Sequence, residues 1–306
     1  MAASYALLRL VLASSSQLPI SQDEYKELKD AQKGLLQLRF AEEKFDVVLQ
    51  NYLEIEIELL SSTARDVICS SGSYDSPHTE RILLNRRLLN LLSSARGYID
   101  HMGYVSNDLC NITAQTIKAK FSERYDASLG YRLMEALRNY TQHRGFPIHS
   151  LTYKYKNVAD AGLNRFRYGI SIYVSRTELA EDPKFKISVL KELPTNNDLI
   201  DLKSMFRDYV ADLATVHEWF RQEMANYTTI WEQRYELAIS RFATTFPHEG
   251  STAGLAAAII NGKEISNELP LFNSFIEYRR ALAIRNSSAT LKRLGVLYVS
   301  NESVDS

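Results

Sequence analysis

The chain has 306 residues, of which 45% are hydrophobic and 24% charged, and its formal net charge is -1 at pH 7. A nearly neutral chain has no overall attraction to nucleic acid, so any such binding must come from a local basic patch. Its two cysteines, Cys69 and Cys110, argue against a disulfide framework and favour a cytoplasmic location.

The first fifteen residues contain an apolar run that resembles the core of a secretion signal. No lysine or arginine precedes this run, and Arg9 interrupts it, so we expect it to belong to the folded protein. No apolar stretch reaches the roughly 18–20 residues that a bilayer-spanning helix needs. The sequence therefore predicts no membrane partner.

Apolar residues spaced three and four apart predict two long helices. The first passes through "LEIEIELL", which alternates like a strand but lies inside the longer periodic run. Its expected buried residues are Leu38, Ala41, Phe45, Val48, Tyr52, Ile55 and Leu59. The second is expected to begin near Pro77, with Leu84, Leu88, Leu91, Ala95, Tyr98, Met102 and Val105 buried. A shorter third helix is expected over residues 113–124.

A fourth helix is predicted within "YRLMEALRNYTQHRGFPIHS" (131–150) and the residues just before it. Either Asp126 or Ser128 provides a side chain that can cap its start. Gly145 and Pro147 are expected to end it. Its expected buried residues are Leu129, Leu133, Leu137 and Tyr140.

The pattern then changes to alternation with a period of two, in "IHSLTYKYKN" and "RFRYGISIYVS". Two such runs joined by a short link predict an antiparallel β-hairpin. Its basic residues are candidates for binding an RNA backbone: Lys154, Lys156, Arg165 and Arg167. The alternative is an exposed polar face above a buried aromatic face that includes Tyr153 and Tyr155.

From Asn196 the apolar period returns to about 3.6 residues, which predicts a very long helix packed in a bundle. Beyond Pro247 we expect a helix over 271–284 and a short strand at "GVLYVS" (295–300). The predicted fold is mainly α with an inserted hairpin. Its parts are a helical bundle (1–146), the hairpin insertion (147–195), the long helix packing on the bundle (196–246) and a mixed tail (247–306).

The polar face of the fourth helix carries the sequence "RNYTQH". On a helical wheel, Arg138 and His143 diverge by about 140° and are separated by about 7.5 Å of rise, with Asn139 between them. One copy cannot easily close both side chains around one small group, but two copies related by a two-fold axis can line a shared cleft. His143 lies in the last turn, where unpaired carbonyls favour the protonated imidazole.

This motif resembles the R-x4-6-H motif of the HEPN-domain ribonucleases. The resemblance implies a helical bundle that forms a homodimer and cleaves RNA without a metal or other cofactor. It implies that His143 is the general base or acid, that Arg138 stabilises the scissile phosphate and that Asn139 orients either group. The products would be 2′,3′-cyclic phosphate and 5′-hydroxyl ends. It further implies a role in phage defence or a toxin–antitoxin system, with an antitoxin or a defence complex as a possible partner.

Three alternatives remain open at this stage. A second pair with the same spacing, Arg96 and His101 in "RGYIDH", lies on the second helix. In the blandest interpretation the RNYTQH segment is a solvated helix end, with Arg138 paired to Glu135. The protein could also be a non-catalytic helical subunit that binds RNA or another protein. No metal is expected, because "HEWF" at His217 lacks the second histidine of a zinc motif and no CxxC is present.

Overall fold

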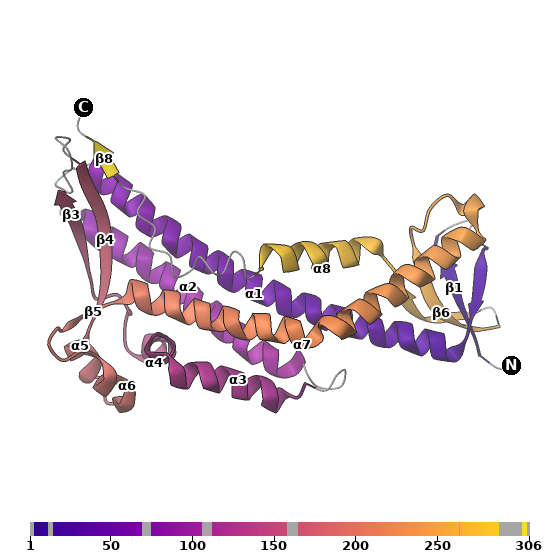
Figure 1. Ribbon diagram of the computed structural model, residues 1–306, viewed down its shortest axis with the longest axis horizontal. Helices are drawn as coiled ribbons and strands as arrows, with labels where there is room; N and C mark the ends of the chain where they lie inside the picture. The colour runs from indigo at the N-terminus through magenta and orange to yellow at the C-terminus, as the bar shows by residue number, and fades with distance from the viewer. Residues whose placement is uncertain are drawn as a thin grey trace. The chain divides into compact units, whose positions relative to one another are not determined.

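The computed structural model describes residues 3–11, 15–68, 75–105, 112–157, 165–262, 264–287 and 302–304. This part of the chain is mainly helical, with small antiparallel sheets (Figure 1). It forms two compact units, each assembled from separate stretches of sequence. Unit 1 comprises Met1–Glu43, Met102–Ala114 and Trp219–Arg285, and unit 2 comprises Lys44–His101, Gln115–Glu218 and Asn286–Ser306.

A four-stranded antiparallel sheet belongs to unit 1, in the order β2-β1-β6-β7. Its strands are β1 (Ser4–Arg9), β2 (Gln17–Ile20), β6 (Leu255–Asn261) and β7 (Glu264–Pro270). The two central strands pair from Ser4 opposite Ile260 to Arg9 opposite Leu255. This sheet is not predictable from the local sequence, because alanine, which fills the middle of β6, favours helices over strands.

Unit 1 also contains the first part of α1 (Gln22–Ile68), the second part of α7 (Leu202–Thr245), η1 (Pro247–Glu249) and α8 (Asn273–Arg285). Arg221 on α7 forms two hydrogen bonds of 2.6 Å with the carboxylate of Glu42 on α1. Glu232 on α7 is nearly buried and pairs with Arg279 on α8. These ion pairs fix the three helices to one another.

Unit 2 is built on the second part of α1, the first part of α7 and three further helices. These are α2 (Asp75–Val105), α3 (Ala114–Ala127) and α4 (Leu129–His143). Every residue predicted to be buried on the first two helices is buried. In the core of unit 2, the ring of Phe45 stacks on His217 at 4.1 Å, and the Tyr98 hydroxyl lies 3.0 Å from His217 Nδ1.

The predicted hairpin is confirmed as β3 (Ser150–Asn157) and β4 (Arg165–Ser175). Two short strands, β5 (Leu199–Asp201) and β8 (Glu302–Val304), pair with the other edge of β4. Two short helices, α5 (Arg176–Ala180) and α6 (Ile187–Glu192), follow β4. The predicted strand at 295–300 lies outside the described residues.

The long helix was predicted to begin at Asn196, and this start is wrong. Leu199 belongs to β5, and α7 begins at Leu202. The carboxylate of Asp201 accepts a hydrogen bond from the Lys203 amide at 2.8 Å, which satisfies a donor at the start of the helix. The preceding residues are therefore free to pair with β4 as an extended strand.

Candidate functional site

Helix α4 is fixed at its start by a cap and by a close approach to α7. The Ser128 hydroxyl accepts a hydrogen bond from the Tyr131 amide at 3.2 Å, so the second of the two predicted caps is used. A Cβ on Gly130 would lie 2.7 Å from the Met205 carbonyl oxygen, so only glycine fits between the two helices. Three of the four predicted inward residues are buried, namely Leu133, Leu137 and Tyr140.

The chain just beyond α4 is held by Asn85 on α2. The Asn85 side chain accepts from the Ile148 amide at 2.8 Å and donates to the Ile148 carbonyl at 3.0 Å. It also donates to the Arg81 carbonyl at 2.9 Å. Asn85 and Ile148 are both fully buried. This paired contact fixes the direction in which the chain leaves α4 and so supports the turn that carries His143.

Arg138, Asn139 and His143 occupy the polar side of α4. Arg138 is half-buried, while Asn139 and His143 are exposed. The Arg138 guanidinium donates to the Asn139 side-chain oxygen at 3.3 Å. Within the part of the chain that the structure describes, no carboxylate forms an ion pair with Arg138.

The pairing of Arg138 with Glu135, part of the solvated-helix alternative, is wrong. Glu135 accepts a hydrogen bond of 2.6 Å from the Tyr209 hydroxyl, and its other oxygen lies 3.7 Å from Arg96. Burial and the Glu135 carboxylate both raise the pKa of Tyr209, so this phenol stays protonated and donates. Glu135 therefore faces Arg96 on α2 and Tyr209 on α7, and it forms no ion pair with Arg138.

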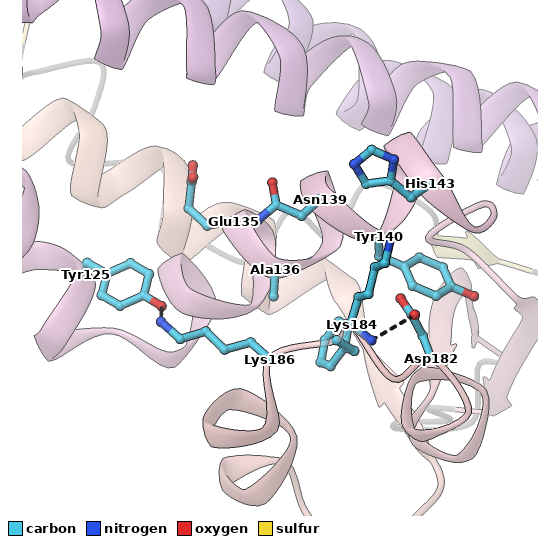
Figure 2. Close-up of a pocket in the computed structure, with 10 residues that line it drawn as sticks. Tyr125, Glu135, Ala136, Asn139, Tyr140, His143, Asp182, Lys184 and Lys186 are labelled. Carbon is cyan, nitrogen blue, oxygen red and sulfur yellow. Dashed lines mark hydrogen bonds between the residues drawn. The ribbon is translucent and has the colours of Figure 1, made fainter.

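A cavity of about 330 Å³ lies beside α4. Figure 2 shows Glu135, Asn139 and His143 on one side of the helix, spaced one turn apart. The cavity is lined by Tyr125, Glu135, Ala136, Asn139, Tyr140, His143, Asp182, Lys184, Phe185 and Lys186. Asn139 and His143 thus line the same cavity, whereas Arg138 reaches it only through its hydrogen bond to Asn139.

Two lysines of this cavity were missed by the sequence analysis. Lys184 and Lys186 come from the segment between α5 and α6, which was predicted only as part of the hairpin insertion. A possible signal was the short sequence "DPKFK", in which a basic residue alternates with an aromatic one after a proline. Nothing in that sequence indicates which helix it faces.

The alternative pair on α2 has a different environment. Arg96 forms an ion pair of 2.6 Å with Asp100 and lies near Glu135, so two carboxylates compensate its charge. Burial is the main reason that the pKa of His101 lies below its ordinary value, and Lys44 adds to the effect. An arginine that is already neutralised is less available to an anionic substrate than Arg138.

Of the basic residues of the hairpin, the described side chains of Lys154 and Lys156 do not line the cavity. Lys154 is exposed and sits 5.4 Å from the centre of the Tyr173 ring, and Lys156 is exposed opposite Arg167 in the β3–β4 register. Arg165 is the first residue of β4, but the side chains of both arginines lie outside the described part.

The expected burial of the aromatic face of the hairpin is only partly correct. Tyr155 is 78% exposed at the far end of β3. Tyr153 is half-buried and donates a hydrogen bond to Glu80 on α2. Burial and the Glu80 carboxylate raise the pKa of Tyr153. Strand β3 is therefore anchored to α2 through Tyr153, and its last side chains, from Lys154 onward, are exposed.

No helix in the described part of the chain combines the length and apolar character needed to cross a bilayer. Within the same residues, no group of three or more His, Cys, Asp or Glu side chains is arranged to hold a metal ion. Comparison of the chain with protein-family models, with curated proteins and with solved structures finds no match.

Proposed function

We propose that the protein is a metal-independent endoribonuclease of HEPN type that uses Arg138, Asn139 and His143. The observation that carries the proposal is the charge arrangement on α4. An exposed imidazole lines a cavity, and an arginine with no ion-pair partner among the described residues is linked to that cavity through Asn139. An uncompensated cation beside a titratable group suits an anionic substrate that must lose and gain protons.

His143 would take the proton from a ribose 2′-hydroxyl, and the 2′-oxygen would then attack the adjacent phosphorus. The bond to the 5′-oxygen breaks, and a general acid returns a proton to that leaving oxygen. The products are a 2′,3′-cyclic phosphate and a 5′-hydroxyl. Arg138 would stabilise the negative charge that develops on the phosphate oxygens, and Asn139 would orient the guanidinium.

The proposal includes a HEPN-like bundle and a homodimer. One α4 carries one His143, whereas the reaction needs both a base and an acid. A second copy would supply the other imidazole, as the resemblance implies, and the divergence of the two side chains on the wheel supports this arrangement. A role in phage defence or with an antitoxin follows from the resemblance alone. The proposed cytoplasmic location follows from the small number of cysteines.

Cleavage of an end-labelled RNA by the purified protein tests this function. His143→Ala is expected to lower the cleavage rate by about 100-fold or more, the usual contribution of general acid–base catalysis. Arg138→Ala should lower the cleavage rate to a similar extent. A substrate with a 2′-deoxy residue at the cleavage site should not be cleaved, because it lacks the nucleophile. The exposed residues His78 and Arg86 on α2 give matched controls, and a metal chelator should have no effect.

A parallel His101→Ala variant decides between the two Arg/His pairs. If it loses activity while His143→Ala keeps it, the site is on α2. If the wild type and all variants show the same level of RNA cleavage, the nuclease proposal is wrong.

A second candidate function is a non-catalytic subunit that pairs with a second copy through α1. Within unit 2, α1 exposes a stripe of large apolar residues at helical spacing, where a solvated helix normally carries polar ones. The stripe consists of Leu53, Ile57, Leu60 and Val67, each between 37% and 51% exposed. Ile57→Lys should then halve the mass measured by light scattering, whereas Gln50→Lys, on an exposed position of the same helix, should not.

A further inference from the structure

Two lysines that line the same cavity as His143 have no ion-pair partner among the described residues. Lys184 and Lys186 are both exposed and both line the cavity. In Figure 2 the Lys184 side chain points toward the end of α4 that carries His143, and the Lys186 side chain points toward Tyr125 on α3. Lys186 donates a hydrogen bond to the Tyr125 hydroxyl and lies 4.6 Å from the centre of that ring.

The segment that carries the two lysines is held rigidly. Asp182 and Phe185 are buried, and the Phe185 amide donates to the Asp182 carbonyl at 3.0 Å. The Phe185 ring packs edge-on against Tyr140 of α4, with 6.3 Å between the ring centres. Both lysines flank the buried Phe185 and line the same cavity. A preorganised pair of cations loses little entropy when it binds a ligand.

The acidic groups of the cavity are already engaged by other partners. Glu135 accepts from Tyr209, and the Asp182 side chain accepts from the Lys184 amide at 3.1 Å (dashed in Figure 2). Neither carboxylate forms an ion pair with a lysine within the described ranges. The cavity therefore presents two lysines that form no ion pair within the described ranges, together with the His143 imidazole.

We propose that Lys184 and Lys186 position the RNA strand by binding two of its phosphates, with one nucleoside held in the cavity between them. This inference rests on the proposed function. A volume of about 330 Å³ is at the lower end of the roughly 300–1,000 Å³ typical of ligand sites. It has room for one unstacked nucleoside but not for a base pair, so the strand must be single at this point.

Phosphate contacts predict a defined dependence on salt. Each phosphate neutralised on a single strand contributes about 0.7 to the slope of log affinity against log salt concentration. Because such contacts carry no base information, loss of either lysine should weaken all RNA sequences alike. This signature separates a lysine that touches phosphate from one that merely supports the fold.

The test uses fluorescence anisotropy of a labelled single-stranded RNA in the His143→Ala background, so that the RNA stays intact. Lys184→Ala and Lys186→Ala are each expected to weaken binding about three- to tenfold and to reduce the salt slope by about 0.7. Lys191→Ala is the matched control, since Lys191 is exposed on the adjacent α6 but does not line the cavity. Circular dichroism of each variant checks the fold.

Equal binding by the three lysine variants would overturn this inference, even if His143 proves essential for cleavage. An unchanged salt slope with weakened binding would also overturn it. If instead wild type cuts no RNA but the two cavity lysines still carry the salt-dependent binding, the nuclease proposal fails and the positioning role survives as RNA binding alone.

Discussion

Replacing Asn85 with alanine should destabilise unit 2 strongly. The substitution leaves the buried amide of Ile148 without its 2.8 Å acceptor and removes the 3.0 Å donor from the Ile148 carbonyl. The carbonyl keeps only a weak contact of 3.4 Å with Arg81. An unsatisfied buried polar group costs about 1–3 kcal/mol, so the two groups together should lower the free energy of unfolding by about 3 kcal/mol.

Urea denaturation followed by circular dichroism measures this loss, and hydrogen exchange of the Ile148 amide reports it locally. Asn90→Ala is the matched control, because Asn90 is exposed on the same helix and its replacement should change stability by no more than about 0.5 kcal/mol. If Asn85→Ala is no less stable than the control, the paired contact does not hold the end of α4, and the reasoning about how His143 is supported is refuted.

Two further predictions concern packing and pH. Gly34→Ala should destabilise unit 1 by about 1–3 kcal/mol, because the new Cβ would lie 2.4 Å from the Trp231 ring. Gly97→Ala, in open space on an exposed helix face, should instead stabilise the protein by about 0.5–1 kcal/mol. Thermal unfolding compares the two variants, and similar effects on stability would contradict the packing of Gly34 against Trp231. Burial holds the pKa of His149 below 6.5, and its Nδ1 accepts from the Ser175 amide at 3.1 Å. Below pH 6.5 the unfolded chain therefore binds a proton that the folded chain refuses, so stability should fall as the pH is lowered through that window and stay level above it. In His149→Gln, the free energy of unfolding measured by denaturation should lose most of this dependence on pH. An unchanged dependence would show that His149 is not its source.

The long helices were predictable because their apolar period repeats over many turns. Residues such as Phe45 and Leu88 recur at the same angular position, and a pattern of that length cannot be satisfied by a strand. The hairpin was predictable because its apolar and polar residues alternate with a period of two, which is the period of a strand. Local sequence is therefore sufficient to predict a helix or strand that buries one continuous face.

The sheet of unit 1 and the wall of the cavity were not predictable in this way. β1 pairs with β6 near the other end of the chain, and neither strand carries enough β-branched residues to be recognised alone. Lys184 and Lys186 meet α4 only because Phe185 packs against Tyr140. The partner of Glu135 was misjudged because Tyr209 and Arg96, on two other helices, compete with Arg138 for the same carboxylate.

The pairing of β1 with β6 has a consequence for synthesis of the protein. Strand β1 is translated long before its neighbour, which spans Leu255–Asn261, so the edge of β1 that faces β6 must wait until the long intervening segment has been made. Contacts so distant in sequence close slowly, because the entropy of the intervening loop is lost before any pairing is gained. A nascent chain stalled before β6 should therefore expose an unpaired strand to chaperones or to aggregation.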